Sequence, residues 1–165
     1  MFLPRIPSGD TILDAGCGSG RDSLAFTKKG FNVTAVDASP ELVEKAKLHT
    51  GLDVQVMRFG EIDYEAEFDG IWACASLLHV SRQDTPAVFR RFVRALKPAG
   101  CWYLSYKYGE GDTERDGRLF SNHTEASLTE LLQGFPELEI VDMSCNTDVR
   151  TQPDYQASIA EPWFV

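Results

Sequence analysis

Short apolar runs alternate along the chain with stretches in which apolar residues recur every three or four positions. The short runs predict buried strands, and the longer spacing predicts helices that pack one face against a sheet. Strands that alternate with helices in this way are typical of an α/β fold with a parallel sheet. The strands are expected at residues 11–13, 32–36, 54–57, 68–75, 101–106 and 138–143. The helices are expected at residues 21–29, from Pro40 onward behind a Ser39 cap, at 85–96 and at 124–133.

A glycine-rich turn joins the first expected strand to the first expected helix. Gly16, Gly18 and Gly20 stand on alternate positions, and Asp14 precedes the first of them by two residues. A dinucleotide-binding turn has the spacing G-x-G-x-x-G, and its third glycine would fall at position 21, where this chain has Arg21. A carboxylate in the turn would also repel phosphates, and it suits a cationic ligand group. The turn therefore favours a ligand that carries an ammonium group and an adenosine.

Segment 14–20, with the sequence Asp-Ala-Gly-Cys-Gly-Ser-Gly, resembles motif I of the class I S-adenosylmethionine (SAM) methyltransferases. Segment 96–100, Leu-Lys-Pro-Ala-Gly, is similar to the Leu-Lys-Pro-Gly-Gly turn that leads this family into its fifth strand, and Ala99 departs from that pattern without harm to a turn. Segment 71–80 resembles the motif IV region of the methyltransferases named for tellurite resistance, a subgroup of class I. The resemblance implies that the chain is an enzyme with SAM as its cofactor.

The same resemblance implies a fold: an α/β, Rossmann-like three-layer sandwich with a mostly parallel central sheet and an antiparallel final strand. It implies a single domain over residues 1–165, with the final strand beginning at 163–165 and cut short there. Members of the family usually carry an N-terminal segment that closes over the cofactor, and motif I stands close to Met1 here. The chain is therefore expected to lack that segment, and to bind its cofactor less tightly than a longer version.

An acidic residue at the end of the second strand, Asp37, is expected to hold the ribose hydroxyls, because a carboxylate accepts two hydrogen bonds at once. A helix-capping or solvated role is the alternative. In the family, the loop after the third strand reads the adenine through an acidic side chain and a neighbouring backbone N–H. Glu61 matches that position best, and Asp63 is its competitor. The expected cofactor-binding residues are Asp14, Gly16, Cys17, Gly18, Gly20, Asp37, Ala38, Glu61, Ile62 and Ala75.

The methyl acceptor is expected beside residues 76–80 and 106–118, because both segments follow strands at the edge of the sheet where ligands bind. His79 is either an acceptor-pocket residue or a hydrogen-bonded structural histidine. Tyr106 ends the fifth expected strand. Lys107, Glu110 and Arg118 belong to the segment that follows, which we expect to be a mobile loop, and an unspecialised surface role fits each of these three as well. Cationic side chains there would favour a small anion, and the subgroup resemblance suggests a chalcogen oxyanion. No catalytic base is assigned, because an anionic acceptor needs none.

The charge balance bears on the partner. The net charge is −9 and the isoelectric point is about 4.8, whereas nucleic-acid binding depends on neutralising phosphates. Arg90, Arg91 and Arg94 fall on the polar side of one expected helix, as solvated residues do. There is no apolar run of membrane-spanning length. A small molecule is therefore expected as acceptor rather than nucleic acid or a membrane, and the oligomeric state is left open.

The four cysteines, Cys17, Cys74, Cys101 and Cys145, have no C-x-x-C spacing and are not grouped with His49, His79 or His123. This spacing argues against a disulfide framework and against a metal site, and it favours a reduced, cytoplasmic location.

Two other functions stay open. A non-catalytic SAM-binding domain would share every cofactor residue named above. An NAD-dependent oxidoreductase would share the fold and Asp37, but Arg21 and Asp14 count against it.

Overall fold

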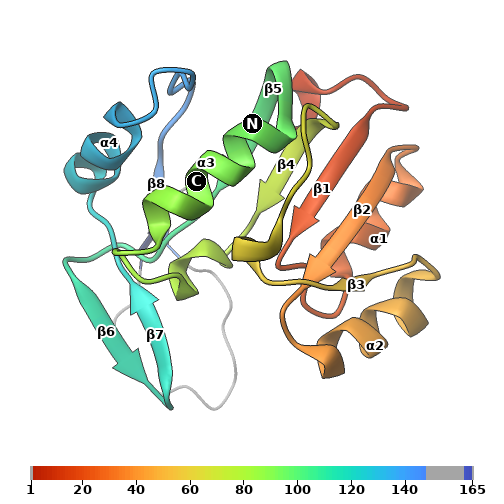
Figure 1. The fold of residues 1–165 in the computed structure, drawn as a ribbon, viewed down its shortest axis with the longest axis horizontal. Helices are drawn as coiled ribbons and strands as arrows, with labels where there is room; N and C mark the ends of the chain where they lie inside the picture. Colours follow the sequence, from red (N-terminus) through yellow and green to blue (C-terminus); the bar gives the residue numbers. More distant parts are fainter. Residues whose placement is uncertain (1, 148–161, 165) are drawn as a thin grey trace.

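The centre of the molecule is a five-stranded sheet in which neighbouring strands pair in parallel. The computed structural model describes residues 2–147 and 162–164. The strands lie in the order β3-β2-β1-β4-β5, and their bounds are Thr11–Ala15 (β1), Asn32–Asp37 (β2), Gln55–Val56 (β3), Phe68–Ala73 (β4) and Leu96–Leu104 (β5). The order changes direction between β1 and β4, where open α/β sheets bind ligands at the carboxyl edge. In Figure 1 the arrowheads of β1, β2 and β4 mark that edge at the lower left of the sheet.

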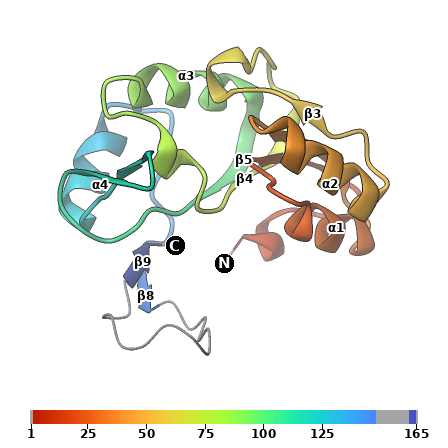
Figure 2. The same ribbon diagram turned by 90° about the horizontal axis from the view of Figure 1, so that it is seen from below.

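Helices cover both faces of this sheet, and Figure 2 shows them as two outer layers. One layer holds α1 (Arg21–Lys28) and α2 (Pro40–Thr50), and the other holds α3 (Thr85–Ala95) and α4 (Glu125–Gln133). The short 3-10 turns are η1 (Leu3–Arg5), η2 (Phe59–Glu61) and η3 (Leu77–His79). The predicted cap of α2 is confirmed, since Ser39 Oγ accepts from the N–H of Leu42 at 3.3 Å. Within the described ranges, no helix combines the length and the apolar character needed to cross a membrane.

The core lies on both faces of the sheet because side chains alternate along each strand. On β1, Leu13 and Ala15 belong to the larger core cluster, together with the apolar residues of α3. Ile12, one position earlier, belongs to the cluster of Phe26 from α1 and the N-terminal Phe2. The side chains of Ile12, Leu13 and Ala15 are fully buried. The nearly continuous apolar runs of β1 and β4 are the consequence, since both of these strands are covered on both sides.

The prediction of a strand at residues 138–143 is wrong. The structure places no strand there, and β8 runs instead from Cys145–Thr147. Leu138 and Met143 do pack against the core, but Ile140 and Val141 are exposed. A strand needs a neighbour for its backbone N–H and C=O groups, and this segment has no ladder partner among the described strands.

The last strand, β9 (Pro162–Phe164), is antiparallel, as the resemblance implied. Its partner is β8, and the two form a separate two-stranded sheet rather than an antiparallel edge of the central one. The expected end of the strand at Val165 lies outside the described residues. The prediction was therefore right about direction and wrong about the sheet to which the strand belongs.

Residues 107–120, expected to be a mobile loop, contain an ordered antiparallel hairpin of β6 (Asp112–Arg115) and β7 (Arg118–Ser121). Asp116 and Gly117 form its two-residue turn with φ values of 53° and 69°. Positive φ at both positions is the geometry of a type I′ turn, and Asp-Gly is one of its preferred pairs. This dipeptide was the local signal that could have predicted the hairpin.

The turn before the main part of β5 corrects a second expectation. Ala99 has φ 64°, a left-handed conformation that glycine adopts without cost and alanine does not. Ala99 lies within β5, at the point where the pairing of this strand with β4 shifts register between Phe68 and Gly70, and its backbone is strained there. Replacement of the family's glycine is therefore not harmless to this turn.

Candidate functional site

The glycine-rich turn lies over the carboxyl ends of β1 and β2. The N–H groups of Gly16 and Cys17 both donate to the carbonyl of Val36, at 2.9 and 3.0 Å. The N–H of Gly20 donates to the carbonyl of Cys17 at 3.0 Å, which closes the turn immediately before α1. Backbone bonds therefore form most of the framework of this turn.

The three glycines of this turn have two different roles. A Cβ atom on Gly16 would lie 2.4 Å from Cβ of Ser76, and one on Gly20 would lie 2.5 Å from Cγ2 of Thr50. These two glycines permit close packing against the segment after β4 and against α2. A Cβ on Gly18 would meet nothing within 4 Å, although its φ is 57°. Gly18 is therefore the position at which the turn leaves its backbone open to a ligand.

Asp14, in β1 two residues before Gly16, carries a buried carboxyl group. Its exposed fraction is 2%, and it accepts a hydrogen bond from Ser23 Oγ at 2.5 Å. Burial raises the pKa of Asp14 to about 7, the nearby charge of Asp22 adds to the rise, and the bond from Ser23 opposes it. A cationic ligand group beside Asp14 would stabilise its ionised form.

Asp37 ends β2 and accepts two backbone hydrogen bonds. Gly18 donates to Oδ2 and Ser39 donates to Oδ1, each at 2.9 Å. The carboxylate therefore holds the glycine turn and the start of α2 in place. Each oxygen of a carboxylate has a second lone pair, so Asp37 still has acceptor capacity for a pair of ribose hydroxyls.

A cavity of about 240 Å³ opens at this place, lined by several of the predicted residues together with others that the sequence did not indicate. Asp22 bridges two of the unpredicted residues, since its carboxylate accepts from Arg21 Nε at 2.8 Å and from Trp72 Nε1 at 3.0 Å. Burial acts to raise the pKa of Asp22, but these two hydrogen bonds outweigh it and the pKa lies below its usual value. The lining residues are Asp14, Gly16, Cys17, Gly18, Ser19, Arg21, Asp22, Trp72 and Cys74.

Trp72 and Cys74 could have been found by pattern, because they occupy alternate positions at the carboxyl end of β4 and so share one face of the sheet. Nothing local distinguishes Asp22 from other acidic residues at helix starts. Cys17 lines the cavity as a neutral thiol, since burial, Asp14 and Asp37 raise its pKa to about 12.

The two candidates for the adenine position have different surroundings. Glu61 Oε2 accepts from the N–H of Arg58 at 2.7 Å within the turn η2. Asp63 is paired with Arg94 and lies 3.8 Å from Arg91, both on α3. Ile62, between them, is fully buried in the core, and its N–H donates to the carbonyl of Phe59 at 3.3 Å. Ala38 is exposed directly after Asp37.

The segment after β4 is tied to both neighbouring strands. Ser76 Oγ donates to the carbonyl of Ala15 at 2.7 Å, and the N–H of Ala75 donates to Ser105 Oγ at 2.8 Å. Ala75 has φ 51°, so an alanine is held in a strained conformation at the carboxyl edge of the sheet. These bonds place Ala75 and Ser76 between the glycine turn and the end of β5.

Three of the five acceptor candidates are associated with the ring of Phe120, on β7, and Glu110 is exposed before the hairpin. The ring of His79 lies edge-on to it with centroids 4.9 Å apart, and Lys107 Nζ lies 4.7 Å from its centroid. Arg118 is two positions before Phe120 on β7, so both side chains are on the same face of the hairpin. Tyr106 differs: it is fully buried against His123, and its hydroxyl makes no hydrogen bond within the described part of the chain.

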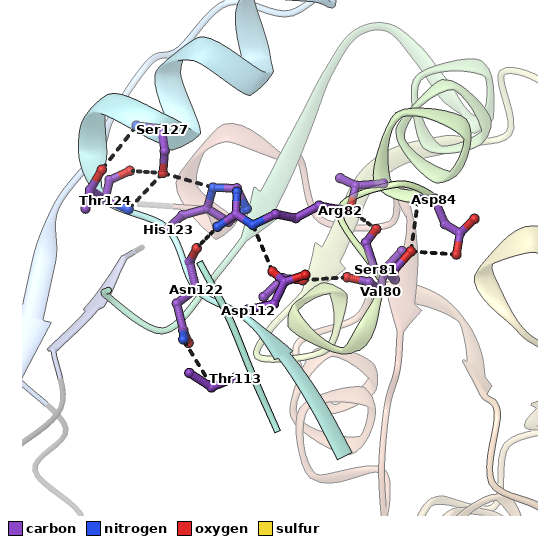
Figure 3. A network of polar contacts seen from close by, with 12 residues as sticks. Val80, Ser81, Arg82, Asp84, Asp112, Thr113, Asn122, His123, Thr124 and Ser127 are labelled. Atoms are coloured by element: carbon purple, nitrogen blue, oxygen red, sulfur yellow. Dashed lines mark hydrogen bonds and ion pairs between the residues drawn. The ribbon is translucent and has the colours of Figure 1, made fainter. Parts of the chain in front are cut away.

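A polar network that sequence reasoning missed anchors the hairpin, and Figure 3 shows it from close by. Arg82 donates from Nε to Asp112 Oδ1 at 2.8 Å and from Nη2 to the carbonyl of Asn122. His123 Nδ1 lies 3.1 Å from Ser127 Oγ at the start of α4. Burial lowers the pKa of His123 to about 4, and the charge of Arg82 adds to this effect, so the ring is neutral at pH 7.

Comparison with known proteins assigns a family to this geometry. Residues 12–100 match a family model described as a methyltransferase domain. The chain belongs to this methyltransferase domain family. The match confirms the resemblance to the class I methyltransferases that segment 14–20 carried, and the Rossmann-like fold agrees with it. The tellurite-resistance subgroup stays a prediction.

Relatives with assigned functions match part of this methyltransferase domain. It is 36% identical over 110 residues to the ubiquinone biosynthesis O-methyltransferase of Xanthomonas oryzae pv. oryzae, a match that covers 59% of this chain and 43% of that protein. The enzyme of the same name from Xylella fastidiosa is 36% identical over 114 residues. The chain thus spans less than half the length of these curated relatives.

Solved structures extend the likeness to nearly the whole chain. The 1,6-didemethyltoxoflavin-N1-methyltransferase of Burkholderia thailandensis, solved with its substrate and S-adenosylhomocysteine bound, is 25% identical and has a TM-score of 0.75. The match covers 95% of this chain and 69% of that enzyme. A SAM-dependent methyltransferase of Methanosarcina mazei has a TM-score of 0.81 at 21% identity, with 98% and 92% of the two chains covered, and it supports the fold alone.

Proposed function

We propose that this chain binds SAM in the cavity at the carboxyl end of β1 and transfers a methyl group from it to a small molecule. The observation that carries the proposal is the buried carboxyl of Asp14, with a pKa of about 7, in a cavity that Gly18 leaves open. SAM, when bound, supplies an electrophilic methyl group on a positively charged sulfur. The lining places two carboxyl groups, Asp14 and Asp22, against the single guanidinium of Arg21. This excess of acid fits the amino-acid part of SAM, which has one more positive charge than negative charges.

The remaining predicted residues would hold the nucleoside. Asp37 accepts the ribose hydroxyls with the lone pairs that Gly18 and Ser39 leave unused. We assign the adenine amine to Glu61 rather than Asp63, because two arginines of α3 already lie against Asp63. Ala38 and Ile62 flank these two acidic residues, and Ala75 lies where the segment after β4 meets the glycine turn.

The acceptor belongs beside the segment after β4 and the β6–β7 hairpin. Lys107 and Arg118 bring positive charge to the hairpin of a chain whose net charge is −9, which supports a small anion as acceptor. A chalcogen oxyanion is the form of that anion which the tellurite-resistance resemblance suggests. One named relative is an O-methyltransferase of ubiquinone biosynthesis and the other binds 1,6-didemethyltoxoflavin, and both support a small-molecule acceptor. A reducing compartment such as the cytoplasm suits this function, because Cys17 and Cys74 line the cavity as free thiols.

Calorimetric titration with SAM and, separately, with NADH tests the cofactor. We expect binding of SAM and of S-adenosylhomocysteine and none of NADH, because Arg21 stands where a dinucleotide turn needs glycine. Transfer is then measured with isotopically labelled SAM and a panel of small anions, thiols and carboxylates. Labelled product from any member supports the enzyme, whereas tight SAM binding with no product from any member would favour the non-catalytic SAM-binding domain.

Asp37→Asn tests the nucleoside site within the same titration. The variant removes the charge and replaces one of the two acceptor oxygens by an NH2 donor, so SAM affinity should fall about 30-fold, or about 2 kcal/mol. Asp53→Asn is the matched control, since Asp53 is an exposed carboxylate beyond α2. An unchanged dissociation constant for Asp37→Asn would remove this residue from the site.

A further inference from the structure

The β6–β7 hairpin is fastened to the segment after β4 at its base and along β7. Ser121 Oγ donates to the carbonyl of Val80 at 2.9 Å, and Arg82 bonds to Asp112 and to the carbonyl of Asn122. His79 Nδ1 lies 2.8 Å from the carbonyl of Leu119, and because a carbonyl only accepts, Nδ1 carries the proton. The hairpin is therefore a fixed wall at the carboxyl edge of the sheet (Figures 1 and 3).

One face of this wall is cationic and aromatic. The register places Thr113 opposite Phe120 and Arg115 opposite Arg118, so these four side chains share a face. Lys107 lies over the ring of Phe120 from the adjoining segment. Arg115 and Arg118, directly opposite each other, bring two positive charges together on this face, and both would attract an anion.

A cavity of about 280 Å³ lies against this face. Its lining combines the aromatic rings of Tyr108 and Phe120 with two cations, Lys107 and Arg115, and one carboxylate, Glu114, so positive charge is in excess. Thr113 and Asn122 complete the lining. The volume is close to the lower end of the range for small-molecule pockets, which suits a ligand with a single ring.

We infer that this cavity is the acceptor subsite and that it is built for a planar aromatic anion, a single ring that carries a carboxylate or a phenolate. The inference rests on the proposed function. The ring would lie against Phe120 and Tyr108, and the anionic group would face Lys107 and Arg115 of the lining. Arg118, directly opposite Arg115 on the hairpin, adds a third positive charge on the same face. An inorganic oxyanion would use the cations but make no ring contact with Phe120 or Tyr108.

Four probes separate these features: benzoate, its neutral isostere benzamide, the saturated anion cyclohexanecarboxylate, and selenite. Each is titrated into the protein with and without SAM while amide chemical shifts are recorded. We expect benzoate to shift the amides of residues 107–108 and 113–122 and to bind at least about tenfold more tightly than the other three. Equal binding of benzamide would overturn the need for an anion, and equal binding of selenite or cyclohexanecarboxylate would overturn the need for a ring.

Variants locate the site. Arg118→Ala and Lys107→Ala should each weaken benzoate binding severalfold, and Phe120→Leu should weaken benzoate more than cyclohexanecarboxylate. Arg90→Ala on the exposed side of α3 is the matched control and should change nothing. SAM titration of the same samples distinguishes the two proposals. A parent protein that fails to bind SAM overturns the proposed function, whereas normal SAM binding with benzoate affinity unchanged in all three variants overturns this subsite alone.

Discussion

The glycine turn and the β6–β7 hairpin both lie at the carboxyl edge of one sheet, but they are built in opposite ways. The turn is held mostly by backbone bonds, such as those from Gly16 and Cys17 to Val36, with one side-chain bond from the N–H of Gly18 to Asp37. The hairpin is held by side chains from distant segments, with Arg82 reaching Asp112 and Asn122. A backbone-built turn tolerates few sequences, whereas side-chain anchors are exchangeable. We infer that the cofactor half of such a domain is constrained and that the acceptor half is free to change its chemistry.

The strongest test of this contrast is Gly16→Ala. The added Cβ would lie 2.4 Å from Cβ of Ser76, and φ is 80°, so overpacking and backbone strain act together. We expect the free energy of unfolding to fall by about 3–4 kcal/mol. Urea denaturation measures the effect. Gly18→Ala is the control: it keeps the strain but meets no atoms, so its loss should stay near 1 kcal/mol, and equal losses would contradict the packing role of Gly16.

Asp14 should make SAM binding depend on pH. Its pKa in the folded protein is raised to about 7, so below pH 7 the free protein holds a proton that a nearby ligand cation would expel. Affinity should therefore rise about tenfold per pH unit from pH 5.5 to 7 and then level off. The folding stability of the unliganded protein should change with pH in the opposite direction. The stability that protonated Asp14 contributes is complete below about pH 4 and is lost as pH rises to 7. Calorimetry should find both slopes reduced in Asp14→Asn, and a parent affinity independent of pH would place the ligand cation elsewhere.

Arg82→Ala tests how the β6–β7 hairpin is anchored. It leaves the carboxylate of Asp112 and the carbonyl of Asn122 without this partner, and because the side chains are partly exposed we expect a loss of only about 1–2 kcal/mol. Hydrogen exchange should quicken in β6 and β7, while SAM affinity stays within twofold of the parent. Arg90→Ala again serves as the control. A large loss of SAM binding would show that the two regions are not independent.

The smallest effect should come from Ala99→Gly, which restores the family residue in a turn outside both regions. Because φ is 64°, glycine removes strain but adds entropy to the unfolded chain. We expect a net gain of about 0.5 kcal/mol in the free energy of unfolding. A thermal melt that shows destabilisation would mean that the methyl group of Ala99 contributes more than its backbone costs.

The sequence predicted the cofactor side well because its signals are local. The apolar run before Asp14 and the glycines at 16, 18 and 20 fix a strand, a turn and a helix within a few residues, and each formed where expected. The acceptor side depends on contacts between distant segments. No pattern near Arg82 points to Asn122, and no pattern near Tyr106 indicates that its hydroxyl is buried. The strand expected at 138–143 failed for the same reason, since alternation is local and a ladder partner is not.

The close approach of Gly16 and Ser76 has a consequence for how this site can evolve. As long as residue 76 has a side chain in its present place, residue 16 is confined to glycine, and Ser76 Oγ is itself committed to the carbonyl of Ala15. The two positions, one on each side of the β1–β4 junction, therefore form a single epistatic unit. Ser76→Gly would have to come first before any larger residue is tolerated at 16, and that first step gives up the bond that joins the loops. A mutational path that starts at residue 76 therefore loses the hydrogen bond between Ser76 and Ala15 before residue 16 can change. Stepwise change of the turn by this path is disfavoured.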